Sequence, residues 1–333
     1  MGNLCKGSFR RACRVWMGLV FLSMLISGVT HAEITYLSIG TAGTAGVYYP
    51  YGLGLAGLWT KTVTGIQAAA EITGGAVENI KFCHKGETTF GVAPNDLAHM
   101  GYYGSGPFQE NPQNIRGMFV MYPNVLHGIA PKKLGIHSIE EFRGRKVSVG
   151  AQGSGTALMT RLVLQRGLGI RFSEFRAVRF SFHQTIEALK KGRIDIGFLN
   201  VAPPAASIAR ILATHEMQLI DFSDEQLSEI IIKNPFYSEF IFPVQFYEDQ
   251  NEEVKAPAVW NLFICNADAD ENLIYGLVKN VFENNDFLKK AHPFAKYTTP
   301  ENTIRYSGIP LHPGAINYLK EMEIEIPEHL LPR

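Results

Sequence analysis

The start of the first globular segment, residues 34–52, reads ITYLSIGTAGTAGVYYPYG. Its first six residues are rich in β-branched and apolar side chains and predict a strand over 34–39. A glycine-rich turn follows, and Pro50 suits the first turn of a helix. Glycine allows the positive φ angles and the close approach that a ligand-facing turn needs. The stretch therefore predicts a strand, a glycine turn and a helix, which is the unit of an α/β fold.

The same succession recurs along the chain. Strands that alternate with helices favour βαβ units and largely parallel sheets covered by helices on both faces. The predicted strands are 34–39, 66–72, 88–92, 125–130, 146–150, 194–199 and 258–266, and the predicted helices are 76–85, 156–167, 184–191, 204–213 and 271–283.

Two polar breaks, at residues 130–135 and 247–255, interrupt this pattern. We interpret them as two crossovers between domains. Lobe I then comprises 33–132 plus 257–333, and lobe II comprises 133–256. A double crossing makes a hinge, because two short segments bend together while each sheet stays rigid.

The first 32 residues have the composition of a secretory signal peptide. They contain four Lys or Arg residues and no acidic residue, and then a 15-residue apolar run from Val15 to Val29. Thr30-His31-Ala32 follows, with small side chains at the positions that signal peptidase reads, so we expect cleavage after Ala32. A membrane anchor is the alternative, but the run is shorter than the ~20 apolar residues that a span needs. We expect a periplasmic, soluble mature protein without a membrane anchor.

Cleavage would change the charge and the cysteine content. It removes four of the 31 basic residues and none of the 31 acidic ones, leaving 27 against 31. A mildly acidic chain without a basic run has no electrostatic footprint for nucleic acid. Only Cys83 and Cys265 remain; we favour two buried thiols over a disulfide. No Cys/His cluster has metal-ligand spacing, so we expect neither a metal nor a cofactor.

The first glycine turn is a candidate ligand site. Unpaired backbone N–H groups at a helix start favour carboxylate or phosphate oxygens. Hydroxyls and tyrosine rings add polar and flat apolar contacts. Packing alone could also explain these glycines, and that alternative stays open. The candidates are Thr41, Gly43, Gly46, Tyr48 and Tyr49.

Further turns repeat this design in both predicted lobes. Open α/β sheets bind ligands beyond the carboxyl ends of their strands, so loops that follow strands are the places to look. An anion held there would be neutralised by amide dipoles and hydroxyls, since no arginine lies in the three glycine-rich turns. The additional candidates are Gly75, Asn79, Asn95, Gly153, Ser154, Thr156 and Asn200.

Five motifs occur in an order that resembles a known family. They are GTAGTAGVYYPYG, TGGAVEN, FRGRKVSVGAQGSGT, ALKKGRIDIGF and IPLHPGAINYL. Together they are similar to the TAXI family, the periplasmic substrate-binding subunits of tripartite ATP-independent (TRAP) transporters, over about residues 35–320. The resemblance implies a two-lobed type II periplasmic-binding-protein fold and a glutamate-like amino acid or another small organic acid as ligand. It implies the small and large integral membrane subunits as partners.

Two segments depart from the family pattern. Residues 93–96 read Ala-Pro-Asn-Asp where Val-Gln-Ser-Asp is common, and residues 200–204 hold fewer glycines than is usual. The loss of a glutamine in a cleft-facing loop puts the usual ligand in doubt. Arg161 lies one helical turn beyond Thr156 and could reach the site, although we favour a surface or packing role.

We therefore predict an extracytoplasmic solute-binding receptor, acting as a monomer, that feeds a TRAP transporter. A binding protein of an ABC importer remains the alternative. An enzyme would need a nucleophile elbow, a metal cluster or an acid/base pair, and none is visible. A sensing ectodomain would need a following membrane span, which we do not expect. His312, between two prolines, is interpreted as a residue that ties backbone together rather than as a base.

Overall fold

The computed structural model describes residues 34–44 and 47–332. The predicted signal peptide and Gly46 lie outside these residues. Residues from Tyr36 onward cluster as one compact unit. The lobe boundaries given above therefore stay a prediction, and we keep the names lobe I and lobe II for those two sets of residues.

The described residues contain ten strands in one mixed sheet. Their order is β2-β1-β3-β10-β4-β7-β5-β6, with β8 paired to β4 and β9 paired to β10. The strands are β1 (Thr35–Gly40), β2 (Ile66–Glu71), β3 (Phe90–Pro94), β4 (Ile115–Pro131), β5 (Lys146–Ser148), β6 (Arg176–Val178), β7 (Ile196–Val201), β8 (Met217–Leu219), β9 (Tyr237–Phe242) and β10 (Val254–Asn266).

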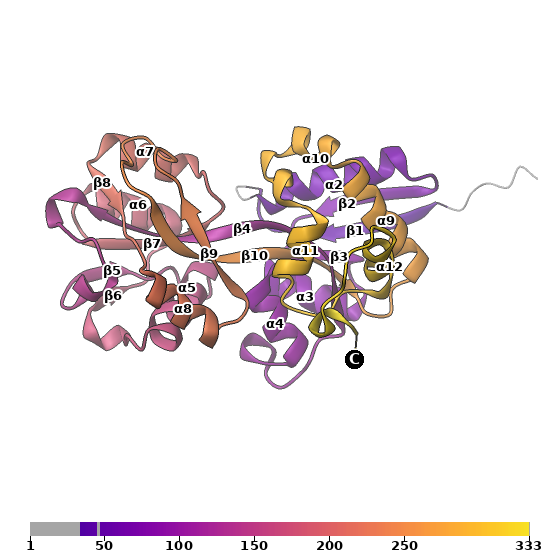
Figure 1. Cartoon of the computed structure of the whole chain (residues 1–333), viewed down its shortest axis with the longest axis horizontal. Helices are drawn as coiled ribbons and strands as arrows, with labels where there is room; N and C mark the ends of the chain where they lie inside the picture. Colours follow the sequence, from indigo (N-terminus) through magenta and orange to yellow (C-terminus); the bar gives the residue numbers. More distant parts are fainter. Residues whose placement is uncertain (1–33, 45–46, 333) are drawn as a thin grey trace, which may run out of the picture. The chain divides into compact units, whose positions relative to one another are not determined.

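The two longest strands, β4 and β10, join the two ends of this sheet (Figure 1). They pair antiparallel with each other, for example Phe263 with Phe119. Further along β4 the partner becomes β7, with His127 opposite Leu199. The expectation of largely parallel sheets is wrong for this centre, because the chain crosses in opposite directions on β4 and β10. Parallel pairs remain on the flanks, where β1 lies beside β3 and β5 lies between β6 and β7.

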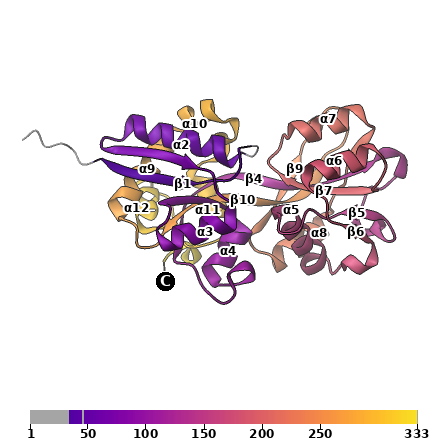
Figure 2. The ribbon, with the colours of Figure 1, turned by 180° about the vertical axis from the view of Figure 1, so that it is seen from behind.

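Helices cover both faces of the sheet, as the view from behind shows (Figure 2). The predicted helix 156–167 is divided into an α-helix and a π-helical segment, Leu162–Gly167. The α-helices are α2 (Tyr48–Thr62), α3 (Ala76–Lys85), α4 (Asn95–Tyr103), α5 (Gly155–Arg161), α6 (Phe182–Lys190), α7 (Ala206–Thr214), α8 (Asp224–Lys233), α9 (Glu271–Glu283), α10 (Asn285–Ala291), α11 (Pro300–Tyr306) and α12 (Pro313–Glu321).

Aromatic side chains fill the core on the lobe I side. The ring of Trp59, on α2, lies 5.3 Å from that of Phe90 and 5.7 Å from that of Phe263. All three are buried, and each aromatic side chain removed from water contributes roughly 1.5–3 kcal/mol. This packing fixes α2 on β3 and β10 and so sets where the loops at their ends lie.

Candidate functional site

The first glycine turn is anchored to β2 by Thr41. The Thr41 hydroxyl donates to the carbonyl of Glu71 at 2.6 Å, and its backbone N–H donates to the same carbonyl at 3.0 Å. Thr41 is fully buried, so its side chain holds the turn. Gly43, by contrast, is exposed, and a Cβ atom built on it would meet no atom of the described residues within 4 Å.

At the start of α2, Tyr48 connects the helix to the long strands. Its hydroxyl donates to Oδ1 of Asn261 at 2.5 Å, and the Asn261 amide donates to the carbonyl of Tyr122 at 2.8 Å. Burial and the nearby Asp96 carboxylate raise the pKa of Tyr48, so this hydroxyl stays protonated. Tyr49 is half-buried.

The second glycine turn is held by Asn79, which is fully buried on α3. Its Nδ2 donates to the carbonyl of Thr41 at 2.7 Å and to that of Val92 at 2.9 Å. Its Oδ1 accepts from the Thr73 hydroxyl at 2.6 Å. Gly75, which precedes α3, has a φ of 105°, a conformation that favours glycine. The hydrogen bonds of Asn79 thus join two loops of lobe I to strand β3.

Asn95 and Asp96 follow β3 and begin α4. The Asn95 amide donates to the carbonyl of Tyr306, and its Oδ1 accepts from the N–H of Gly308 at 3.1 Å. Both partners belong to lobe I, so Asn95 ties α4 to the end of α11. Asp96 instead accepts a hydrogen bond from the Tyr237 hydroxyl of lobe II at 3.1 Å. The sequence singled out Asn95 and passed over Asp96.

Ser154, in the turn after β5, caps helix α5. Its Oγ accepts the N–H of Ala157 at 3.1 Å and donates to the carbonyl of Ala151 at 2.7 Å. The hydroxyl of Thr156 accepts the N–H of Asn200 at 3.2 Å, which links this turn to β7. The Oδ1 of Asn200 is buried and has no hydrogen-bond partner among the described residues. Gly153 has a φ of 80°, with open space around its α-carbon.

A cavity of about 480 Å³ opens beside this turn. Lobe I contributes three apolar residues, and lobe II contributes most of the polar lining. Gly153 and Ser154 line the cavity; the other predicted ligand residues that the structure describes do not. The lining residues are Val77, Leu97, Pro107, Gln152, Gly153, Ser154, Gly155, Ala157, Leu158, Arg161, Gln165, Phe172 and Arg179.

Two arginines give this cavity its charge. Arg161 ends α5, and Arg179 directly follows β6. Among the residues that the structure describes, neither forms an ion pair, whereas Arg143 and Arg171 both pair with Glu174. Guanidinium groups bind carboxylate, sulfonate and phosphate oxygens well, often through two parallel hydrogen bonds. The cavity is therefore suited to an anionic group.

Sequence reasoning missed Arg179. The parallel pairing of β5 with β6 places residues 179–180 at the same sheet edge as the glycine turn that follows β5, and the Val149 N–H donates to the Val178 carbonyl at 3.0 Å. The three-residue strand β6 was too short for its apolar pattern to be recognised. An arginine directly after a strand was the available signal.

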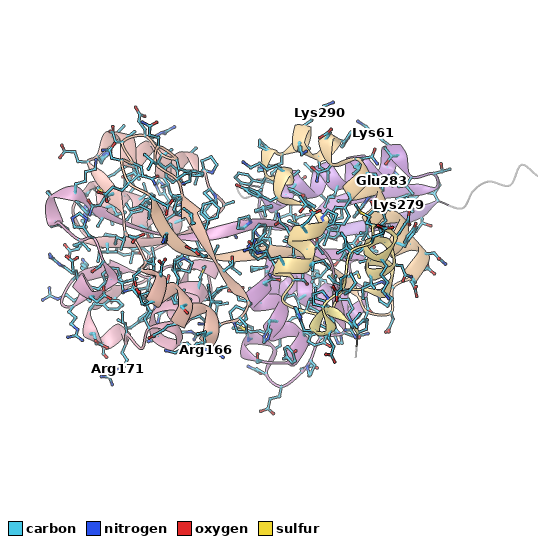
Figure 3. All side chains as sticks on the ribbon, viewed as in Figure 1. Lys61, Arg166, Arg171, Lys279, Glu283 and Lys290 are labelled. Carbon is cyan, nitrogen blue, oxygen red and sulfur yellow. The ribbon has the colours of Figure 1, made fainter. Side chains whose placement is uncertain are left out.

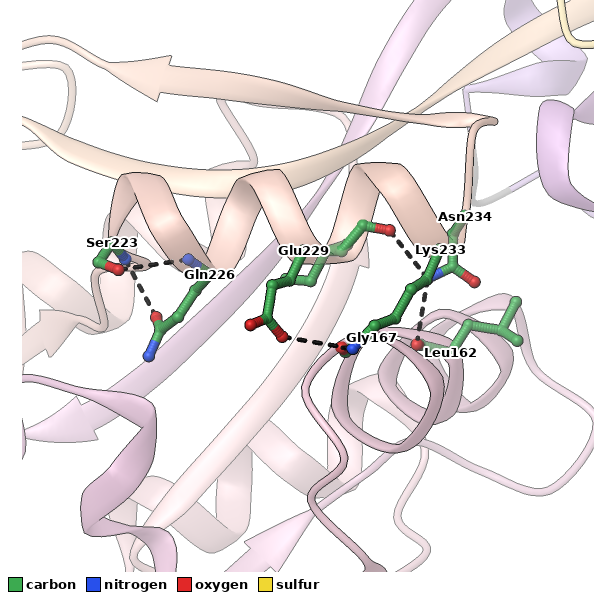
Figure 4. Close-up of polar contacts among 8 residues, drawn as sticks. Leu162, Gly167, Ser223, Gln226, Glu229, Lys233 and Asn234 are labelled. Atoms are coloured by element: carbon green, nitrogen blue, oxygen red, sulfur yellow. Dashed lines mark hydrogen bonds and ion pairs between the residues drawn. The ribbon is translucent and has the colours of Figure 1, made fainter.

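The π-helical segment 162–167, which directly follows Arg161, is braced by residues at the C-terminal end of α8 (Figure 4). Lys233 donates from Nζ to the carbonyl of Gly167 at 2.6 Å. Asn234 donates from Nδ2 to the carbonyl of Leu162 at 3.5 Å. These bonds satisfy carbonyls of the π-helical segment, which otherwise has an irregular ladder. The brace fixes the end of α5 at the cavity.

The two cysteines and His312 are buried or bonded to the backbone. Cys83 and Cys265 are both buried free thiols, as expected. Burial raises the pKa of Cys83 to about 12, so the thiolate is not formed near neutral pH. His312 accepts the N–H of Gly314 at 3.2 Å and thereby caps α12, which agrees with the backbone-tying role expected for it. Across the described residues, no group of three His, Cys, Asp or Glu could hold a metal ion.

Several solved structures share this architecture, among them those of two binding proteins. The TctC solute-binding protein from Polaromonas aligns over 86% of this chain and 98% of that chain, with a TM-score of 0.53 and 12% identity. The periplasmic aliphatic sulphonate binding protein SsuA from Escherichia coli aligns over 87% and 84%, with a TM-score of 0.51 and 11% identity. XAC2383 from Xanthomonas citri, solved with ATP bound, aligns over 86% and 95%, with a TM-score of 0.52 and 11% identity.

The fold is therefore the α/β periplasmic-binding-protein fold, with a mixed sheet flanked by helices, and the predicted fold class is confirmed. Residues 39–322 match the NMT1-like family, and the chain belongs to that family. Membership of the TAXI group stays a prediction.

Each helix in the described part of the chain is too short or too polar to cross a bilayer.

Proposed function

We propose that this protein is an extracytoplasmic solute-binding protein that captures a small organic anion, or an amino acid through its carboxylate, in the cavity beside the turn after β5. The single observation that carries the proposal is the pair Arg161 and Arg179 on one cavity without carboxylate partners among the described residues. An arginine that only confers solubility has no need to line a cavity. Two arginines that line the same cavity favour an anionic ligand.

The cavity has one wall from each predicted lobe, and the two walls together support the same function. Val77, Leu97 and Pro107 come from lobe I and are apolar, while Gln152 and Gln165 come from lobe II and can donate hydrogen bonds. A ligand with an anionic head and a short carbon body would satisfy both walls. Because the walls belong to different predicted lobes, bound ligand would favour the conformation in which both contact it.

This site differs from the one predicted from the sequence. The sequence favoured an anion held by amides and hydroxyls alone, in loops of both lobes. Thr41, Asn79 and Asn95 use their side chains to hold other parts of the backbone. Gly153, Ser154 and the open backbone at Gly43 remain candidates for ligand contact, together with the two arginines.

The function in the cell follows from the family resemblance and from the N-terminus. We propose export to the periplasm with signal cleavage near Ala32, and delivery of the solute to the small and large membrane subunits of a TRAP transporter. The motif order quoted above supports this partner. A binding protein of an ABC importer remains the second candidate, because type II periplasmic-binding folds serve both kinds of transporter.

A thermal-shift screen of the mature protein, 33–333, tests solute binding. Amino acids, keto acids, dicarboxylates and short sulfonates are each added at millimolar concentration, and calorimetry follows on every compound that raises the melting temperature. A ligand at 100 times its Kd stabilises the folded state by about 2.7 kcal/mol. We expect anionic compounds to raise the melting temperature and neutral analogues of equal size to have no effect.

Matched arginine variants locate the site. Arg161→Ala and Arg179→Ala should each weaken the anion found in the screen at least ten-fold, because a charge-assisted hydrogen bond is worth about 1.5–3 kcal/mol. Arg171→Ala is the control, since the Arg171 side chain lies at the surface (Figure 3) and is not among the residues that line the cavity. Equal affinity in all three variants would contradict the proposed site.

Reconstitution separates the two transporter classes. Proteoliposomes that contain the TRAP membrane subunits should accumulate the solute when an ion gradient is imposed and the binding protein is present. Accumulation that requires ATP and the subunits of an ABC importer would favour the second candidate.

A further inference from the structure

A side-chain hydrogen bond joins two buried residues of the two predicted lobes, as the bond between His127 and Tyr247 also does. Asp96 begins α4 in lobe I, and Tyr237 begins β9 in lobe II. The Tyr237 hydroxyl donates to Oδ2 of Asp96 at 3.1 Å, and the Leu97 N–H donates to Oδ1 at 2.8 Å. Asp96 is only 2% exposed and Tyr237 only 3% exposed. A carboxylate buried to this degree needs its hydrogen bonds, so the pair is held in place by its surroundings.

The helix that carries Asp96 also contacts the ligand cavity. Leu97, the next residue, lines the 480 Å³ cavity. On the same helix, the ring of His99 lies 5.3 Å from that of Phe236, which precedes Tyr237. Helix α4 therefore contacts two consecutive residues of lobe II, Phe236 and Tyr237, and faces the cavity through Leu97.

The charged groups around Asp96 leave it without a counter-ion. Tyr48 faces it from α2, and Tyr237 faces it from β9. The charges of Arg161 and Arg166 act to lower the pKa of Tyr237, and His99 lies one helical turn along α4. Within the described residues Asp96 forms no ion pair. Burial raises the pKa of Asp96 to about 6, with the bonds to Leu97 and Tyr237 opposing that rise.

We propose that Asp96 and Tyr237 are positioning residues whose hydrogen bond, here called the latch, holds α4 against β9. The latch thereby sets the fraction of molecules in which the two lobes are in contact. The inference goes beyond the proposed function, and it requires no ligand. When the lobes part, both groups regain water and the bond is lost. The balance between the two conformations then includes the cost of burying the carboxylate and the gain from the bond.

This arrangement makes the contact depend on pH. With the lobes apart, Asp96 is hydrated and its pKa returns toward the ordinary 3.8; with the lobes in contact it is about 6. Between these values the contact conformation binds more protons. Lowering the pH from 8 to 5 therefore shifts the population toward contact.

Pulsed electron–electron resonance on the ligand-free mature protein tests the latch. Spin labels are placed through Lys85→Cys in lobe I and Arg143→Cys in lobe II, both at exposed positions. The native thiols are buried with raised pKa values, so they should resist labelling. The measured quantity is the ratio of short-distance to long-distance populations at pH 5 and pH 8.

Three variants give distinct expectations. Tyr237→Phe keeps the ring and removes the hydroxyl, and should lower the short-to-long ratio several-fold at both pH values. Asp96→Asn keeps an acceptor oxygen without the charge, and should give at both pH values the ratio that the unmodified protein reaches at pH 5. Tyr103→Phe is the control on the same helix, because Tyr103 is exposed, and should change nothing.

A Tyr237→Phe distribution identical to the unmodified one would overturn the latch, as would an unchanged pH response in Asp96→Asn. Circular dichroism confirms that each variant is folded. Because no solute is present, failure of the latch leaves the arginine test of ligand binding untouched, and failure of that test leaves this one valid.

Discussion

The side-chain amide of Asn79 donates to the backbone carbonyl of Thr41 at 2.7 Å, and thereby joins the two glycine-rich turns of lobe I. The same amide also donates to Val92 on β3. A Cβ atom on Gly40 would lie only 2.8 Å from the Asn79 Oδ1, so the glycine is required for this approach. Asn79 thus holds the shape of the two turns.

Asn79→Ala should lower the free energy of unfolding by about 2–4 kcal/mol, because it leaves the carbonyls of Thr41 and Val92 without their buried donor. Urea denaturation measures the change. Asn251→Ala serves as the control, since Asn251 is exposed and should lose less than about 0.5 kcal/mol. An Asn79→Ala variant with an unchanged free energy of unfolding would show that the turns are held by other contacts.

Ser154→Ala should reduce stability and ligand affinity together. Ser154 caps α5, and loss of a cap costs about 1 kcal/mol. Ser181 caps α6 in the same way and lies outside the lining of the cavity, so Ser181→Ala should cost similar stability and leave affinity unchanged. Calorimetry with the screened anion compares the two. Equal affinities would mean that the Ser154 hydroxyl acts only as a cap.

Glycine substitutions should separate open positions from tight ones. Gly150 has a φ of 90°, and a Cβ atom on it would lie 2.6 Å from the backbone nitrogen of Ala157. Gly150→Ala should therefore destabilise the protein by more than 1 kcal/mol. At Gly43 a Cβ atom meets none of the described residues within 4 Å, so Gly43→Ala should be tolerated in thermal denaturation. Equal losses at both positions would contradict this assignment.

Acid should destabilise the protein through His127 on β4. The imidazole is buried and contacts the Val125 carbonyl at 2.9 Å and the Tyr247 hydroxyl at 3.0 Å. Burial lowers the pKa of His127 to about 4. The unfolded chain binds a proton below pH 6.5 while the folded one does not, so His127 contributes stability at neutral pH. That contribution is lost as the pH falls from 6.5 to 4, by up to about 3 kcal/mol.

His127→Gln should flatten this part of the pH profile, whatever its effect on stability at pH 7. Urea titrations at pH 4, 5, 6 and 7 provide the measurement. His215, exposed at the end of α7, is the control, and His215→Gln should preserve the slope. A slope that survives in His127→Gln would assign acid sensitivity to other groups.

Local patterns predicted several elements well. The helices 76–85 and 271–283 were predicted with the bounds that the structure shows, since each has an amphipathic period and clear ends. The strand expected at 125–130 is the second half of β4, which begins at Ile115. Gly117 and Pro123 interrupt the apolar pattern in the first half of β4. The strand passes close to Leu311 at Gly117, and beyond Pro123 it changes its partner from β10 to β7.

The proposed site was harder to predict, because pairing between distant segments forms the cavity. Two residues that line the cavity, Gly153 and Ser154, were among the predicted ones, since a glycine-rich turn before a helix is visible locally. Arg179 was not, because its place depends on the pairing of β5 with β6. Asp96 likewise acquires its partner, Tyr237, from a segment 141 residues away. Such contacts leave no mark in the local sequence.

A crystal structure of the mature protein with the anion identified by the screen tests the central claim most directly. We predict electron density for the solute in the cavity beside the turn after β5, with its anionic group within 3.2 Å of a guanidinium nitrogen of Arg161 or Arg179. A solute of measured affinity that instead occupies another part of the protein, with both arginines facing solvent, would contradict the account.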